Sequence, residues 1–379
     1  MNGLGRQIEA ALLLVGTIVG VGMFGIPFVF ARAGFLLAAI ELCIVAAAVA
    51  VVHLAYAEVA LRTDAVHRLP GYVARYMPSL RWVSRLSHLF GLSGALLAYI
   101  VLGGFFFGQL LHAFFPVIPS AIGPAAFYLI GMAVVGGSIR LGGLLNGILT
   151  IGLVAVTLVL VGMLVPNVSV ASLTTWNPAL AAVPYGVLLF AMAGMAVIPD
   201  ARRLLGPKAG RLGRLVLFGT LGAAALYLLF AFGVVGATGA ATTPDAISGL
   251  AIRFGPEYLL VGGFVAFLAA ITSFIGLGIV FESMLSLDFG VRPVAATVLT
   301  AAVPAVLYTL GLHDFIRIIG LVGAVAIGLD SIMVLGIHRR AVVQGEREPE
   351  FRLRIPAAIR WGLILLFILG MAAELVYFR

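Results

Sequence analysis

The sequence predicts an all-α polytopic membrane protein, and its composition and apolar patterning predict this together. Only 10% of the 379 residues are charged and 63% are hydrophobic, whereas a soluble domain needs about 25% charged residues to cover its surface. Apolar runs of about 18 residues or more, long enough to cross a bilayer, recur along the whole chain. We therefore expect a protein embedded in lipid, with no nucleic-acid partner despite the net charge of +8.

The apolar runs define about eleven spans that are joined by short connections. The single cysteine, Cys43, lies inside one of these runs, which excludes an intramolecular disulfide and a cysteine-based metal site. The approximate bounds of the spans are 8–33, 36–61, 86–112, 122–139, 142–165, 181–200, 214–236, 257–284, 292–311, 314–337 and 359–377.

The distribution of positive charge predicts the orientation. If the N-terminus is placed inside, roughly 19 of the 23 Lys and Arg residues fall on the inner side of the membrane. Positive residues are retained on the cytoplasmic side of membrane proteins. We therefore expect the N-terminus inside, the C-terminus outside, and a place in the cytoplasmic (inner) membrane of a prokaryote.

The first span contains a glycine cluster that a continuous helix would not tolerate. Residues 16–27 read GTIVGVGMFGIP, and each interior Gly costs about 1 kcal/mol and Pro about 3 kcal/mol relative to Ala. In hydrocarbon, broken backbone is stable only where it lines a cavity or a ligand. We predict that this span unwinds near Gly20–Gly22 and binds a solute at mid-membrane, as in secondary transporters.

The sixth span repeats this pattern. Residues 22–27 and 194–199 both read Gly-Met-x-x-Ile-Pro, and the two spans run in opposite directions by the charge distribution. Two broken helices five spans apart with inverted orientation predict an inverted 5+5 repeat. We expect the first half over 1–165, the second over 166–340, and a cytoplasmic linker with an eleventh span over 341–379.

These motifs resemble a known family. Together with the Arg-Leu-Pro-Gly-Tyr loop at 68–72 and Thr-Ser-Phe-Ile-Gly at 272–276, they resemble the amino acid–polyamine–organocation superfamily, and within it the tryptophan/tyrosine permease branch. The resemblance covers nearly the whole chain in order. It implies the leucine-transporter-type fold with broken helices 1 and 6 and one extra C-terminal helix. It also implies ion-coupled import of amino acids by alternating access.

An amino acid needs hydrogen-bond donors for its carboxylate and acceptors for its ammonium group. Free N–H groups at the start of a half-helix supply the donors, and unwound carbonyls supply the acceptors. The alternative is that the glycines only allow close helix packing. An aromatic side chain on the third span and one beside the second break complete the expected pocket. The predicted substrate site comprises Ile18, Gly20, Val21, Gly22, Met23, Tyr99, Phe190, Ala191, Met192 and Gly194.

A coupling ion is the only cofactor that we expect, and it is sodium or a proton. The resemblance implies a sodium site of neutral oxygens between the first and eighth spans, which suits a hard cation. The alternative is that the hydroxyls bond back to carbonyls of their own helix, with a proton as the coupling ion, as in known members of the branch. The sodium site would comprise Gly16, Val19, Ala269, Thr272 and Ser273.

Acidic residues within spans are functional candidates because their burial is costly. The acids at the inner ends of the sixth and eighth spans, Asp200 and Glu282, are expected to form ion pairs in an inner gate. Their expected partners are Arg6, Arg202 and Arg203. The candidates for gating or proton transfer are Glu58, Asp200, Glu282 and Asp330.

Other functional classes are less consistent with the sequence. No Asp-rich motif, His/Glu pair at i,i+4 or Ser/His/Asp arrangement lies within the spans, so we expect no enzyme, and we place His88 at the membrane interface. A channel or scramblase would not need two broken helices. A divalent-metal transporter on the same fold would need an acidic or amide ligand in the first break, and residues 16–27 contain neither. We expect a monomer or a weak homodimer.

Overall fold

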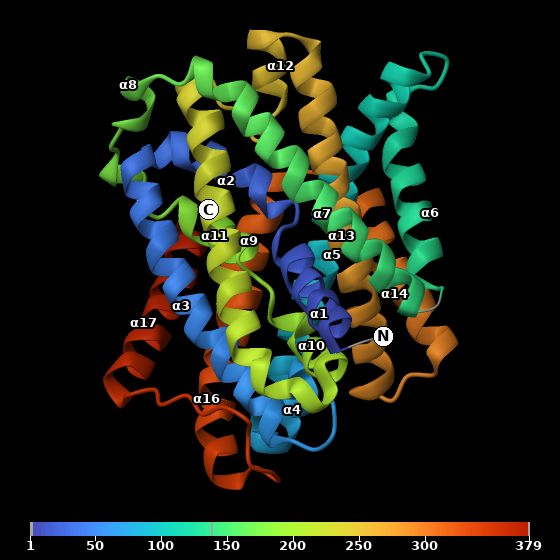
Figure 1. The fold of residues 1–379 in the computed structure, drawn as a ribbon, viewed down its shortest axis with the longest axis vertical. Helices are drawn as coiled ribbons and strands as arrows, with labels where there is room; N and C mark the ends of the chain where they lie inside the picture. The colour runs from blue at the N-terminus through green and yellow to red at the C-terminus, as the bar shows by residue number, and fades with distance from the viewer. Residues whose placement is uncertain (1–2, 138, 378–379) are drawn as a thin grey trace.

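The structure is a computed structural model that describes residues 3–137 and 139–377. The regular elements of these residues are all helices, and they form one bundle (Figure 1). The helices are α1 (Gly3–Ile18), α2 (Gly22–Ala33), α3 (Phe35–Arg62), α4 (Leu69–Tyr76), α5 (Arg81–Phe114), α6 (Gly123–Val135), α7 (Ile139–Leu164), α8 (Val170–Leu173), α9 (Pro184–Ala191), α10 (Ile198–Leu205), α11 (Leu212–Thr238), α12 (Ser248–Phe254), α13 (Pro256–Leu287), α14 (Pro293–Thr309), α15 (Phe315–Leu321), a π-helical segment (Val322–Ile327), α16 (Gly328–Gln344) and α17 (Ala357–Tyr377).

Helices lie over every predicted span. Within the described residues, 7 helices are long and apolar enough to cross a membrane, or up to 8 if the bent pair α1 and α2 forms one span. One of these segments, Pro184–Ala241, covers both the sixth and the seventh predicted spans, and Ser120–Val135 and Pro293–Thr309 are shorter apolar helices. The protein is therefore an integral membrane protein, and the number of eleven spans stays a prediction.

The basic connections meet at one end of the bundle. In Figure 1, α4, α10 and the C-terminal end of α16 lie at the bottom, whereas α8 and α12 lie at the top. The linker after α16 contacts the end of α3, because the Glu346 N–H donates to the Arg62 carbonyl at 2.8 Å. The bundle thus has one strongly basic end, which the positive-inside rule assigns to the cytoplasm. We call this end the basic end; its membrane orientation stays a prediction.

Both predicted helix breaks are confirmed. Helices α1 and α2 meet at an angle of 45°, with the unwound residues 19–21 between them. Helix α9 ends at Ala191, and the chain passes through residues 192–194 and a short 3₁₀ turn, Met195–Val197, before α10 begins. Corresponding glycines mark the two breaks, since Gly22 begins α2 and Gly194 directly precedes the 3₁₀ turn.

The two breaks pack against each other at the centre of the bundle. A Cβ atom added to Gly22 would lie 2.7 Å from the Ala191 Cα, and one added to Gly194 would overlap the Ile18 side chain. Only glycine allows this approach. The contact is reciprocal, as an inverted repeat requires. The limits of the two halves at 165 and 340, and of the last segment at 341–379, stay predictions.

The last helix lies at the edge of the bundle. Only 17% of the most apolar window of α17 is buried, compared with 83% for α13. Helix α13 instead packs against α1, α5 and α7. The extra C-terminal helix therefore takes no part in the central cavity described below, and α13 forms one of its walls.

Candidate functional site

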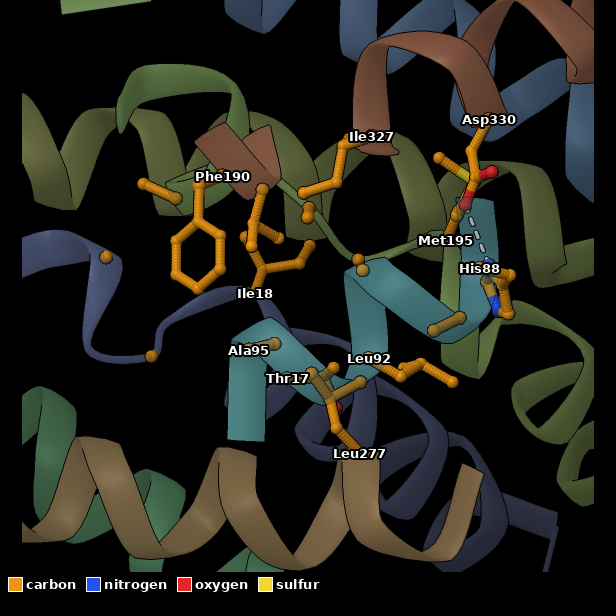
Figure 2. Close-up of a pocket in the computed structure, with 18 of the residues that line it drawn as sticks. Thr17, Ile18, His88, Leu92, Ala95, Phe190, Met195, Leu277, Ile327 and Asp330 are labelled. Atoms are coloured by element: carbon orange, nitrogen blue, oxygen red, sulfur yellow. Dashed lines mark hydrogen bonds and ion pairs between the residues drawn. The ribbon is translucent and has the colours of Figure 1, made fainter. Parts of the chain in front are cut away.

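A cavity opens between the two breaks and extends toward the basic end (Figure 2). Its volume is about 600 Å³ when counted out to the open mouth, which lies within the range of small-molecule sites. The cavity is narrow along its length. Its walls come from both breaks, α5, α13, the π-helical segment and α16.

The predicted substrate residues gather at one end of this cavity. Three of them, Val21, Met23 and Met192, are buried beside it and are not among the residues that line it. The predicted residues that line it are Ile18, Gly20, Gly22, Tyr99, Phe190, Ala191 and Gly194. The structure therefore brings together the two breaks and the aromatic residue of the third span, although they are distant in sequence.

The first break satisfies several of its own backbone groups. The Gly20 N–H donates to the Ile18 carbonyl at 2.9 Å, and the Met23 N–H donates to the Gly20 carbonyl at 3.2 Å. The Met23 N–H, predicted to face a carboxylate, is therefore occupied. The carbonyl of Ile18 points instead to a side chain from another helix.

That side chain is Tyr227 of α11, which contacts both breaks. Its hydroxyl lies 2.6 Å from the Ile18 carbonyl oxygen and 2.9 Å from the Ala191 carbonyl oxygen. Tyr227 is 0% exposed. A hydroxyl has one hydrogen to share between two acceptors, and of the two carbonyls that of Ile18 also accepts the Gly20 N–H. Sequence reasoning missed Tyr227 because a single Tyr within an apolar span carries no motif.

The second break depends on a side-chain relay. The Gly194 N–H lies 3.3 Å from His53 Nε2 on α3, and His53 Nδ1 lies 2.9 Å from the Thr220 hydroxyl on α11. Since an N–H can only donate, Nε2 accepts and Nδ1 carries the hydrogen. Thr220 in turn donates to the Val216 carbonyl at 2.8 Å. A neutral His53 thus pairs the backbone group freed at this break.

The predicted sodium residues also lie together, but their oxygens bond to one another. The Ser273 hydroxyl on α13 donates to the Gly16 carbonyl on α1 at 3.0 Å. The Thr272 hydroxyl bonds back to the Ala269 carbonyl at 3.1 Å, and Val19 is buried nearby in the first break. A cation between α1 and α13 would have to replace the bond between Ser273 and Gly16.

The inner ion pair has a different cationic partner from the ones expected. The Asp200 carboxylate of α10 accepts hydrogen bonds from both terminal guanidinium nitrogens of Arg68, one of them at 3.0 Å. The expected partners were Arg6, Arg202 and Arg203. The segment before α4 folds back beneath α10 and places Arg68 there. Arg202 instead donates to backbone carbonyls at the end of α3, including Thr63 at 2.8 Å.

Arg68 lies next to the inner end of the cavity. It donates to the carbonyl of Ala196, a lining residue, at 3.2 Å and to the Ser283 hydroxyl of α13 at 2.7 Å. Burial lowers the pKa of the Arg68 guanidinium, but Asp200, Tyr56 and Asp288 together raise that pKa by more, so it lies above its usual value. Arg68 therefore stays charged and links three segments.

The other two acids near the basic end, Glu282 and Glu58, contact neighbouring helices and the C-terminal linker. Glu282 accepts a hydrogen bond from Thr297 of α14 rather than pairing with an expected arginine. Glu58 is fully buried and contacts Arg62 at 2.8 Å and His338 at 2.9 Å. Glu58 also accepts from the Leu353 N–H at 2.7 Å, so it holds the C-terminal linker against α3.

His88, which we expected at the membrane interface, is buried within the protein and lines the cavity. It is 5% exposed, and its Nδ1 lies 2.7 Å from Asp330 Oδ2 (Figure 2). The sequence held a signal for this position: His88, Leu92, Ala95 and Tyr99 follow one face of a helix at i, i+4, i+7 and i+11. All of these residues line the cavity.

The fold and the cavity are those of a membrane transporter. Two broken helices of opposite direction expose backbone groups to a cavity near the middle of the bundle, as in secondary transporters. Within the described residues, no group of three or more His, Cys, Asp or Glu side chains could hold a metal ion.

Comparison with known proteins agrees with this class. The chain belongs to the tryptophan/tyrosine permease family, whose profile matches residues 6–372. Among solved structures, it is similar to MhsT in complex with L-phenylalanine, with a TM-score of 0.65 and 16% sequence identity over 98% of this chain and 97% of that chain. No curated protein sequence matches it. The protein therefore has the leucine-transporter-type fold and is a permease.

Proposed function

We propose that this protein imports an aromatic amino acid by alternating access across a prokaryotic cytoplasmic membrane, and that it binds the amino acid between the two helix breaks. One observation carries the proposal: the carbonyls of Ile18 and Ala191, one from each break, converge on a single hydroxyl beside the cavity. The family supports an amino acid as substrate, and MhsT, of the same fold, binds L-phenylalanine.

The backbone of the breaks suits a zwitterion. The ammonium group would bind the carbonyls of Ile18 and Ala191, which share one hydrogen at present. The carboxylate would lie at the start of α2 near Gly22, where free N–H groups and the helix dipole favour an anion. These glycines allow the two breaks to pack closely, and they also bring backbone groups of both breaks to the wall of an open cavity.

The side chain of the substrate would lie among apolar residues. Phe190, Leu92 and Ala95 line the cavity next to the breaks. Because the cavity is narrow in this structure, an aromatic ring requires it to widen, and a shift of the π-helical segment would provide this change. A π-helical segment within an α-helix frequently marks a functional site.

The Arg68–Asp200 pair would act as the inner gate. It joins the segment before α4 to α10, and it lies directly below the lining residue Ala196. Release of the substrate toward the basic end requires these segments to separate. The driving gradient would be of sodium or of protons.

Uptake by proteoliposomes tests the proposed function. Purified protein is reconstituted, and saturable uptake of radiolabelled tryptophan, tyrosine and phenylalanine is measured against a panel of other amino acids. We expect uptake of at least one aromatic amino acid, and its loss in Gly22→Val. The matched control is Gly222→Val on α11, where an added Cβ contacts nothing within 4 Å. Absence of saturable amino acid uptake under either gradient would contradict the proposal.

A further inference from the structure

The inner half of the cavity contains a buried histidine–aspartate pair that substrate binding at the breaks does not use. His88 on α5 and Asp330 on α16 are 5% and 4% exposed. Asp330 also accepts from the Ser87 hydroxyl at 2.7 Å. The second ring nitrogen of His88, Nε2, is buried without a hydrogen-bond partner. A buried polar atom of this kind calls for an explanation.

We propose that His88 and Asp330 form the site that binds the coupling proton, which is carried on Nε2 of His88. The inference deepens the proposed function and rests on it, because a coupling ion has meaning only for a transporter. The two residues of the pair come from different helices. Ser87, which also bonds to Asp330, lies in the same turn of α5 as His88.

The position of the pair shows that it is not part of the amino acid site itself. The Tyr99 hydroxyl lies beside the first break, because a Cβ atom added to Gly20 would lie 3.4 Å from it. His88 lies three turns earlier on α5, about 16 Å away at 1.5 Å per residue. This exceeds the length of an aromatic amino acid, so a substrate held by the breaks does not reach His88.

The charge of the pair explains why a proton would bind. With Nδ1 donating to Asp330, a neutral His88 leaves the pair with a net charge of −1. A net charge is tolerated while water fills the inner cavity, but it is costly once the cavity closes. A proton on Nε2 converts the pair into an imidazolium–carboxylate pair with no net charge. Closure of the inner cavity and proton binding therefore favour each other.

The surrounding charged groups do not neutralise the negative charge of the pair in place of this proton. The positive charge of Arg68 is already paired with Asp200, and the hydroxyl of Tyr56 on α3 lies within electrostatic range of Asp330. Asp288, at the end of α13, contacts His67 and the Arg68 N–H. The titratable group that interacts with the pair from a neighbouring helix is Tyr56 of α3, and Tyr56 in turn interacts with Tyr72, Arg68 and Asp288.

Two variants separate proton binding from structural support. In His88→Asn, the amide nitrogen can still donate to Asp330, as Nδ1 does, but nothing replaces the basic Nε2. In Asp330→Asn, the negative charge that stabilises an imidazolium is removed. The matched control is His112→Asn, which changes an exposed histidine at the other end of α5.

Proteoliposomes with an imposed inward proton gradient provide the test, with aromatic amino acids as substrates. We expect wild-type protein and His112→Asn to concentrate the amino acid when driven by the proton gradient. We expect His88→Asn and Asp330→Asn to lose this concentrative uptake at least 10-fold. Asp330→Asn should retain exchange of internal for external amino acid within about 3-fold, because it removes the negative charge and exchange requires no net proton movement. His88→Asn leaves the Asp330 charge uncompensated and should also slow exchange. Retained exchange shows that Asp330→Asn folds.

A measurement on the wild-type protein keeps the inference testable if the variants do not fold. Calorimetric titration with the amino acid is repeated at one pH in buffers of different ionisation enthalpy. Proton uptake on binding makes the observed enthalpy depend on the buffer, and this is the expected result. A buffer-independent enthalpy contradicts the inference.

The remaining outcomes separate the two proposals. Concentrative uptake that follows a sodium gradient and ignores the proton gradient would overturn the proton site and leave amino acid transport at the breaks intact. Proton-driven uptake that survives in His88→Asn would also overturn the site. No binding and no exchange of amino acids by the wild-type protein would instead overturn the proposed function, and the coupling site with it.

Discussion

The two helix breaks share a sequence pattern but are stabilised differently. The break between α1 and α2 is short, and its turn is closed by hydrogen bonds within residues 18–23. The break between α9 and α10 is longer, and it uses His53 from α3 to pair the Gly194 N–H. Tyr227 of α11 contacts a carbonyl in each of the two breaks.

This difference indicates which break is easier to move. A turn closed by its own backbone keeps its geometry when its neighbours shift, whereas the second break changes whenever α3 or α11 moves relative to it. We expect the second break to respond to changes in the surrounding helices and the first to act as a preformed part of the binding site.

The largest effect is expected at the glycine contacts between the breaks. An added Cβ at Gly22 would meet the Ala191 backbone, but one at Gly194 would meet the flexible side chain of Ile18. Gly22→Ala should therefore weaken amino acid binding about 100-fold, or about 2.7 kcal/mol, and Gly194→Ala markedly less. The measurement is equilibrium binding of a radiolabelled aromatic amino acid to purified protein.

A double variant checks this interpretation. Ile18→Ala should relieve the overlap at Gly194→Ala and restore part of its affinity, but it should do nothing for Gly22→Ala. Equal losses in both single variants, with no rescue in either, would show that the two contacts are equivalent.

A smaller effect is expected for Tyr227→Phe, which removes the hydroxyl from the buried Ala191 carbonyl and leaves the Ile18 carbonyl with the Gly20 N–H alone. Loss of such a partner costs about 1–3 kcal/mol, so thermal stability without substrate should fall. Because an ammonium group can then serve both carbonyls, saturating amino acid should recover most of the lost melting temperature. The control is Tyr258→Phe, whose hydroxyl contacts the Met163 carbonyl away from the breaks. Loss of stability that the amino acid does not recover would place the ammonium group elsewhere.

His53→Leu should affect the second break alone. It removes the acceptor for the Gly194 N–H, and an unpaired buried N–H costs about 1–3 kcal/mol. Hydrogen–deuterium exchange should accelerate in residues 192–197 and remain unchanged in residues 19–23. Faster exchange in both segments would mean that the two breaks open together and that the contrast drawn above is wrong.

The smallest effect is expected for Thr220→Val, which removes the group that orients His53. One hydrogen bond is worth about 0.5–1.5 kcal/mol, so exchange in residues 192–197 should rise less than in His53→Leu. Thr157→Val serves as the matched control, because Thr157 bonds to the Leu153 carbonyl within its own helix. A larger effect at Thr220 than at His53 would contradict the relay.

The fold and the breaks were predictable because they depend on local chemistry. Apolar runs, and glycines followed by a proline, constrain a helix in lipid wherever its neighbours lie. Partners across the bundle were not predictable in the same way. Asp200 has several arginines within reach in sequence, and only the fold of the segment before α4 brings Arg68 to it.

The groups that stabilise the breaks were missed for a related reason. Tyr227 and His53 each lie alone within an apolar span, and nothing in their neighbouring residues reveals that a freed backbone group is close. His88 differs, because its helical register with Leu92, Ala95 and Tyr99 was visible in the sequence. That register places a polar residue on the face that lines the cavity.

The most direct test of the account is an experimental structure of the protein with a bound aromatic amino acid. We predict density for the ligand between residues 18–22 and 190–194, with its ammonium group within hydrogen-bond distance of the Ile18 and Ala191 carbonyl oxygens. An amino acid bound in the separate pocket lined by Gln109, Asp245 and Tyr308, with no ligand between the breaks, would contradict it.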